Sequence, residues 1–193
     1  VRTQNEDSIG EEIELGTVVL ADGMGGYHGG EVASGIAVNT ILNYLHEHIP
    51  GIRKPTTDPE TGLTQESLVA RQAIQHANLS ILKTARSQNQ YQGMGTTVDA
   101  LFVGQGRCYV GHVGDSRVYR VRDGSLGLVT EDHSLLNDWR RMKEMSGEEV
   151  QSFPHKNVVV RALGLAESVN VDVLVEEAAI GDLQAGLQAG VLE

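Results

Sequence analysis

The order of two kinds of hydrophobic pattern constrains the fold of this 193-residue chain more than any other feature. Residues 14–21 (ELGTVVLA) form a short, apolar, β-branched segment, and two segments with helical periodicity follow it, over residues 31–49 and 63–87. Residues 96–130 then form short segments rich in Val, Tyr and Thr, interrupted by the hairpin signal Asp123-Gly124. This order predicts an α+β fold in which helices and antiparallel strands form separate layers.

The sequence beyond residue 130 predicts shorter elements. A polar helix is expected to begin at His133 and to end near Met145, and residues 146–149 (SGEE) have the capping-box spacing of another short helix. Residues 158–163 and 171–175 are expected to be strands.

Composition argues against several classes of partner. The chain has 26 Asp and Glu against 15 Lys and Arg, a formal charge of -11 that repels nucleic acid and anionic lipid. No apolar run approaches the roughly 18 residues of a membrane span. No secretory signal precedes the polar run after Val1, and the single cysteine, Cys108, fits a reducing compartment. We therefore expect a cytoplasmic protein without a nucleic-acid or membrane partner.

Three groups of acidic residues stand at strand ends or turns. Asp22 begins the glycine-rich run DGMGG after an apolar strand, where a cation can reach side-chain and main-chain oxygens together. An isolated Asp-Gly pair is more often a simple tight turn. Glu6 and Asp7 precede another strand, and Asp115 lies between two β segments. Together, these acids predict a shared oxygen-ligand site for Mg²⁺ or Mn²⁺.

Other catalytic chemistries lack their sequence signals. The seven His and one Cys show no zinc-ligand spacing. Cys108 is not followed by the arginine with which a cysteine phosphatase holds phosphate. Neither a Gly-x-Ser-x-Gly elbow nor a glycine loop of the Walker type is present.

Five motifs occur in the order found in one enzyme family. They are residues 2–7 (RTQNED), 22–26 (DGMGG) with 30–34 (GEVAS), 95–97 (GTT), 111–119 (GHVGDSRVY) and 130–134 (TEDHS). In these motifs the chain resembles the PPM (PP2C-like) metal-dependent serine/threonine protein phosphatases of bacterial type. Residues 161–164 (RALG) resemble a sixth motif, so the resemblance covers about residues 1–182.

The resemblance implies one domain over residues 1–193, with a β-sandwich of antiparallel sheets flanked by helices and a two-metal centre at one end. It also implies Mg²⁺ or Mn²⁺ as two core metals, a third and weaker metal, and a metal-activated water that attacks phosphorus in line. The implied roles are a metal bridge for Asp22, a carbonyl ligand for Gly23, water-mediated support of the metals for Glu6 and Asp7, the third metal for Asp115, and phosphate binding for Arg2.

The resemblance leaves the roles of other motif residues open. Tyr27 stands where many bacterial relatives have a histidine, and His28 follows it, so the general acid stays unassigned. Packing or turn roles are at least as good an interpretation for Thr96, Thr97 and Ser116, and structural roles are expected for His112 and His133. Residues 147–156 correspond to a mobile flap in bacterial members.

The C-terminal segment departs from the family pattern. A member would continue into Ser-Asp-Gly and Gly-x-Asp-Asn segments, whose aspartates are core metal ligands, whereas residues 184–193 read QAGLQAGVLE. The C-terminal part is thus expected to be missing or altered, through truncation, through intervening segments absent from the sequence, or through loss of two ligands.

Two classes of function follow from these observations. The leading hypothesis is a metal-dependent phosphatase that hydrolyses phosphoserine and phosphothreonine in bacterial signalling, with phosphorylated proteins, a Ser/Thr kinase or its substrates as partners. The alternative is a catalytically impaired, phosphatase-like binding or regulatory module. A metal-dependent hydrolase of another phosphate ester is a third hypothesis.

Overall fold

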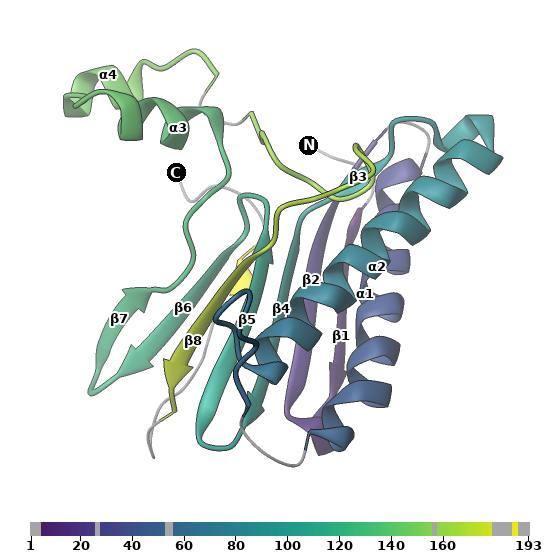
Figure 1. Ribbon diagram of the computed structural model, residues 1–193. Coiled ribbons are helices and arrows are strands. Elements are labelled where there is room, and N and C mark those ends of the chain that lie inside the picture. The colour runs from purple at the N-terminus through teal and green to yellow at the C-terminus, as the bar shows by residue number, and fades with distance from the viewer. Residues whose placement is uncertain (1–4, 26–27, 53–55, 156–157, 179–186, 189–193) are drawn as a thin grey trace.

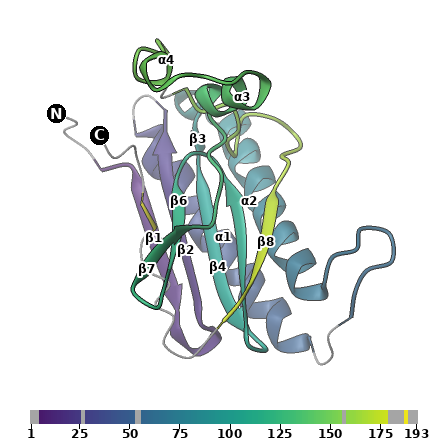
Figure 2. The same ribbon diagram turned by 90° about the vertical axis from the view of Figure 1, so that its left-hand side faces the viewer.

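Two antiparallel sheets form the centre of the molecule, and a pair of long helices covers one of them (Figures 1 and 2). The computed structural model describes residues 5–25, 28–52, 56–155, 158–178 and 187–188. The predicted α+β sandwich flanked by helices is confirmed.

The larger sheet has the strand order β1-β2-β4-β5-β8, with β3 paired to the end of β2, and the smaller sheet has the order β7-β6-β9. The elements along the chain are β1 (Asp7–Glu12), η1 (Ile13–Leu15), β2 (Thr17–Met24), α1 (Gly29–His48), η2 (Ile49–Gly51), α2 (Gln65–Ser87), η3 (Asn89–Tyr91), β3 (Gly95–Thr96), β4 (Val98–Gly104), β5 (Arg107–Val113), β6 (Arg117–Arg122), β7 (Ser125–Leu128), α3 (Leu135–Met142), α4 (Gly147–Gln151), β8 (Asp172–Glu177) and β9 (Leu187–Gln188).

Helices α1 and α2 are the two helices predicted from periodicity. Each places a stripe of buried residues against the larger sheet, including Ile41 of α1 and Ile74 of α2, and these residues share a core cluster with Val19 and Phe102 of the sheet. The predicted stripes therefore face the core, as their period requires. Among the described residues, no helix is both long and apolar enough to cross a membrane.

The two faces of the larger sheet pack against different layers of the molecule. Val98 and Ala100 of β4 belong to the core under the helices, whereas Leu101 packs with Val110 and Val118 in a second cluster toward the smaller sheet. This division follows from the alternation of side chains along a strand. Asp99 lies on the same face as Leu101, so the strand places a charged residue between the sheets.

Short-range signals were confirmed where the sequence predicted them. The turn between β6 and β7 has Asp123 at φ 49° and Gly124 at φ 71°, the two positive values of a tight hairpin turn. Ser146 and Glu149 form the predicted capping box of α4. The polar helix predicted from His133 to about Met145 is present but shorter: it begins after Ser134, whose side chain accepts from the Asn137 N–H, and ends at Met142.

The prediction of a strand over residues 158–163 was wrong. This segment makes only isolated bridges, from Val159 to Ser134 and from Leu163 to Thr96. Its hydrogen bonds go to two different parts of the molecule, so no single neighbour continues a ladder along it. The predicted departure at residues 184–193 lies outside the described residues, apart from the two residues of β9 that pair with β6.

Candidate functional site

Two acidic segments meet where β1 begins and β2 ends. Asp7 lies directly opposite Asp22 in the antiparallel pair. Residues that are directly opposite point to the same face, with Cβ atoms about 5 Å apart. The Gly23 N–H donates to the Glu6 carbonyl over 3.1 Å, which extends the contact by one residue. The structure therefore brings together four of the predicted site residues.

The shared face of Asp7 and Asp22 is the one that points away from the helices. Ser8, the next residue of β1, bonds Ser34 of α1 over 2.8 Å, and Ala21 belongs to the core under the helices. Since neighbouring residues of a strand face opposite sides, the two aspartates point toward the side of the smaller sheet.

Two glycines allow three backbone segments to approach closely at this point. A Cβ on Gly23 would lie 2.1 Å from the Gly30 carbonyl oxygen and 2.5 Å from that of Glu6. A Cβ on Gly30 would lie 2.7 Å from Oε1 of Glu6, so this carboxylate rests against the first turn of α1. The N-terminal end of a helix dipole favours a negative charge there. The glycine motif therefore permits close contact as well as a turn.

The segment of Asp115 is joined to that of Asp22 by buried hydroxyl groups. The Asp22 N–H donates to Oγ1 of Thr97 over 3.1 Å, and the Thr97 N–H donates to the Asp22 carbonyl over 2.9 Å. Thr97 Oγ1 lies 2.9 Å from Oγ of Ser116. Thr97 and Ser116, for which the sequence left a packing or turn role and a chemical role both open, thus connect the two acidic segments.

Asp115 lies half-buried beside a strong ion pair. Burial raises the pKa of Asp115, and the nearby charge of Asp132 acts in the same direction. Arg117 holds Asp132 through two bonds, of 2.8 Å from Nε and 2.6 Å from a terminal guanidinium nitrogen. This pair fixes the Asp132 carboxylate near Asp115.

A fully buried pair lies on the same face of the sheet and was missed by the sequence analysis. Asp99 and His112 are fully buried, with 2.7 Å between Oδ1 and Nδ1, and Nε2 of His112 lies 3.0 Å from the Glu131 carbonyl. That carbonyl only accepts, so Nε2 carries a proton. Burial lowers the pKa of His112, but Asp99 outweighs it, and the net shift is upward. The charged Asp99 within a β segment was the available signal.

The oxygen atoms that meet at this point are of the kind that binds a divalent cation. Asp7 and Asp22 offer opposed carboxylates, and Gly23 offers a neighbouring carbonyl, which are the oxygen ligands that Mg²⁺ and Mn²⁺ prefer. Mg²⁺ needs only one or two carboxylates when it keeps waters. Within the described part of the chain, no group of three or more His, Cys, Asp or Glu side chains could hold an ion. The oxygen donors of Asp7, Asp22 and Gly23 therefore match Mg²⁺ or Mn²⁺ in chemical type. The other positions in the coordination shell of the cation would be filled by waters or by other residues.

The outcome differs among the predicted site residues. Glu6, Asp7, Asp22 and Gly23 lie together, and Asp115 lies on the neighbouring turn connected through Thr97. Arg2 and Tyr27 are outside the described residues, so the predicted phosphate contact stays a prediction. His28 is exposed at the start of α1, with Nδ1 3.5 Å from Glu31.

Comparison with known families and sequences gives one consistent result. Residues 2–159 match the family described as Protein phosphatase 2C. The serine/threonine phosphatase stp of Listeria welshimeri is 36% identical over 178 residues, which cover 91% of this chain and 67% of the relative. The serine/threonine protein phosphatase PstP of Mycobacterium tuberculosis is 33% identical over 182 residues, which cover 94% of this chain and 32% of PstP.

Solved structures agree with the sequence comparison. The crystal structure of the Mycobacterium tuberculosis phosphatase PstP/Ppp superimposes with a TM-score of 0.78 at 30% identity, covering 94% of this chain and 71% of that one. The catalytic domain of PstP in complex with 2 manganese ions superimposes with a TM-score of 0.72 at 29% identity, covering 94% and 70%. The chain thus spans about two thirds of the Listeria relative and somewhat more of these solved domains.

Proposed function

The chain belongs to the protein phosphatase 2C family, and from this membership we propose that it hydrolyses phosphoserine and phosphothreonine in proteins with divalent metal ions. Its relatives are serine/threonine phosphatases by name, and one solved relative holds 2 manganese ions. Phosphorylated proteins are accordingly the proposed substrates, and Mg²⁺ or Mn²⁺ the proposed cofactors.

One observation carries the proposal: Asp7 lies opposite Asp22, next to the close contact of Gly23 with Glu6 and Gly30. Opposed carboxylates at a sheet edge repel each other unless a cation or protons lie between them. Glycine at positions 23 and 30 keeps side chains out of this contact. A site for a hard cation is the function that this arrangement supports best.

Each residue of the site has a proposed task. Asp22 and the Gly23 carbonyl would hold the core cations, Glu6 and Asp7 would support the waters around them, and Asp115 would hold a further cation. When bound, the cations lower the pKa of a water and neutralise charge on the phosphoryl oxygens. Thr97 and Ser116 would keep Asp22 and Asp115 at a fixed spacing. Arg2 would bind the substrate phosphate through its guanidinium.

The test is hydrolysis of a phosphothreonine peptide by the protein read to the stop codon of its gene, with Mn²⁺ and with EDTA. Asp22→Asn should lower Mn²⁺-dependent turnover by at least about 100-fold, the scale for removal of one charge-stabilising group. It changes little volume, so the thermal midpoint should stay close to that of the wild type.

The matched control is Asp123→Asn in the turn between β6 and β7. Asp123 has a φ of 49°, a conformation that asparagine also adopts, so turnover should be unchanged. Full activity of Asp22→Asn would refute the metal role of Asp22. Peptide binding without turnover in the wild type would instead favour the impaired binding module.

A further inference from the structure

The turn before Asp115 is held by one buried residue. The backbone N–H of His133 donates to the Gly114 carbonyl over 2.7 Å, and the Gly114 N–H donates to the side-chain Nδ1 of His133 over 3.0 Å. Both polar groups of Gly114 are thus bound to the same residue. Gly114 also has a φ of 125°, and a Cβ there would lie 2.5 Å from Cβ of Thr97. The turn is therefore fixed from two sides.

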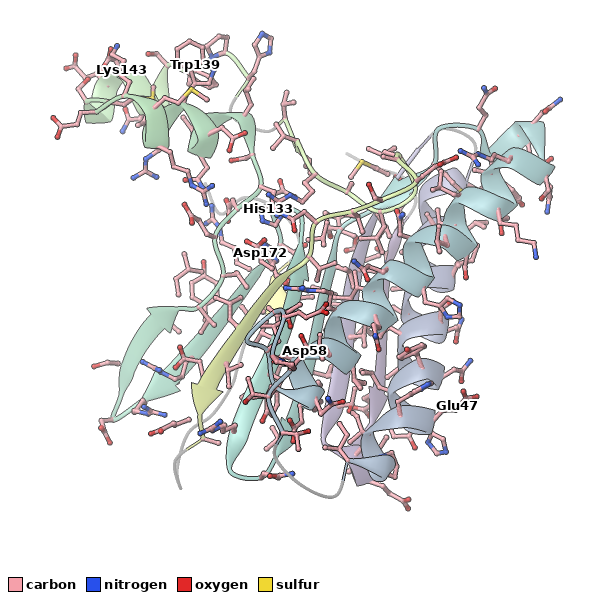
Figure 3. The ribbon with its side chains drawn as sticks, in the orientation of Figure 1. Glu47, Asp58, His133, Trp139, Lys143 and Asp172 are labelled. Atoms are coloured by element: carbon pink, nitrogen blue, oxygen red, sulfur yellow. The ribbon has the colours of Figure 1, made fainter. Side chains whose placement is uncertain are left out.

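The hydrogen bonds of His133 define its tautomer. Nδ1 accepts from Gly114, so the proton of a neutral ring is on Nε2. Nε2 lies 3.1 Å from Oδ2 of Asp172, the first residue of β8, to which it can donate, and 2.8 Å from Nη1 of Arg161, which cannot accept its proton. Arg161 donates to Oδ1 of Asp172 over 2.8 Å. The side chain of His133 is 3% exposed, and Figure 3 shows it beside Asp172 between the sheets and α3.

The contacts of His133 resemble those of residues that orient a metal ligand or catalytic group without touching the substrate themselves. The acceptor nitrogen faces the turn, and the donor nitrogen faces both Asp172 and Arg161, which are hydrogen-bonded to each other. Such a chain orients an imidazole more strictly than packing alone. Asp115 follows Gly114 directly, so rotation of the Gly114 peptide would redirect the Asp115 carboxylate.

We propose that His133, oriented by Asp172 and Arg161, is a positioning residue that fixes the Gly114 peptide and thereby aims Asp115 into the site. The inference rests on the proposed function, because it assumes that Asp115 binds a cation. A purely structural His133 would support stability alone. The two roles differ in what happens to cation binding when the fold is preserved.

The experiment compares His133→Leu, which removes the acceptor, with His133→Asn, whose Oδ1 can take the place of Nδ1. Mn²⁺ binding is titrated by electron paramagnetic resonance on the full protein. His133→Leu should weaken the Asp115-dependent Mn²⁺ by about 10-fold or more, as for other supporting residues of metal sites. His133→Asn should restore most of that affinity. In an Asp115→Asn background, His133→Leu should have no further effect.

The control for lost stability is Asn78→Ala, which removes buried hydrogen bonds to Gly164 and Ala166. It should lower the thermal midpoint without changing the Mn²⁺ titration. In the wild type, ¹⁵N spectra should show a coupling across the hydrogen bond from the Gly114 amide to His133 Nδ1, independently of activity.

The outcomes separate the two proposals. A wild type that binds no Mn²⁺ would refute the proposed function, and the positioning role with it. If the wild type binds Mn²⁺ and His133→Leu changes only the thermal midpoint, as Asn78→Ala does, the positioning role alone is refuted. Additive effects of His133→Leu and Asp115→Asn would also overturn it.

Discussion

The two long helices and the two short helices of this molecule are stabilised in different ways. Helix α1 buries eight residues and α2 buries nine, whereas α3 and α4 bury none. In Figure 1, α1 and α2 lie along the larger sheet, while α3 and α4 extend beyond the ends of its strands. Helices without a buried face depend on local interactions, because short helices are marginal in water.

The local interactions of α3 and α4 are visible in the structure. Ser134 caps α3 and Ser146 caps α4. Exposed ion pairs join Glu131 to Arg141 and Lys143 to Glu149. Each such interaction contributes about 1 kcal/mol or less. This difference indicates that two parts of the molecule can respond separately to mutation. The body, which consists of the two sheets with α1 and α2, should unfold as one cooperative unit. The α3–α4 segment, residues 134–152, should be able to unfold with little loss of stability in the body.

The largest expected effect comes from truncation of a side chain under the helices. Ile41→Ala, at a fully buried position, should reduce the free energy of unfolding by about 2–5 kcal/mol, because it leaves a cavity between α1 and the sheet. The contrasting change is Met142→Ala in α3, where the side chain is 82% exposed, with an effect within about 0.5 kcal/mol. Urea denaturation measures both. Similar costs for the two variants would break the comparison.

A smaller effect is expected at the polar end of the body. Thr97→Val keeps the shape but removes the acceptor of the Asp22 N–H and the contact with Ser116, so stability should fall by about 1–3 kcal/mol. Ser152→Ala also removes a hydroxyl that bonds a backbone carbonyl, but in the exposed end of α4, and should change global stability by less than about 0.5 kcal/mol. An unchanged urea midpoint for Thr97→Val would show that water replaces the lost bonds.

The parts of the fold that were predicted from sequence are those with local or periodic causes. The helical stripes of α1 and α2, the Asp123-Gly124 turn and the capping box each depend on residues that are close in sequence. The segment over residues 158–163 has strand-like composition, but distant partners at residues 133–135 and Thr96 decide its hydrogen bonding. No local pattern contains that information.

The same distinction applies to the candidate site. Asp22 and Asp115 could be selected from the glycine motifs that contain them, and the structure places Asp22 within β2 rather than in a turn. Their connection through Thr97, 75 residues from Asp22 in sequence, depends on the order of strands in the sheet. The buried partner of His112 was missed for the same reason, because Asp99 becomes its neighbour only through the register of β4 and β5.

A local loss of stability is expected when the cap of α4 is removed. Ser146→Ala deletes the acceptor of the Glu149 N–H and should destabilise α4 by about 1 kcal/mol. Amide exchange over residues 147–151 should accelerate about fivefold, since 1.4 kcal/mol corresponds to tenfold. Exchange in α1 should be unchanged. Acceleration in both helices would mean that α4 unfolds together with the body.

The smallest expected effect is a pH response of the α3–α4 segment and the residues that lead into it. Hydrogen bonds from Arg141, and next from Asn137, lower the pKa of Glu131 from 4.5 to about 2. A carboxyl group whose pKa is lower in the folded state stabilises that state above pH 4.5, and this contribution disappears as the pH falls from 4.5 to 2. Glu131 is exposed, so solvent screens the pair and the effect is small.

Trp139 in α3 is the only tryptophan of the sequence, and its ring centroid lies 6.1 Å from that of Phe153, so its fluorescence reports this segment. Acidification from pH 4.5 to 2 should change that fluorescence in the wild type before the far-ultraviolet signal of the long helices is lost. Glu131→Gln should reduce the early change by eliminating one titrating group, and Glu149, whose pKa the hydrogen bond from Lys143 lowers to about 2, accounts for the remainder. Glu47→Gln on the exposed side of α1 should preserve the full change (Figure 3). An early change of undiminished size in Glu131→Gln would assign the acid response to another group. If the fluorescence and far-ultraviolet transitions coincide instead, α3 is coupled to the body more tightly than its exposed contacts indicate. The two pairs of helices would then differ in packing but would unfold together.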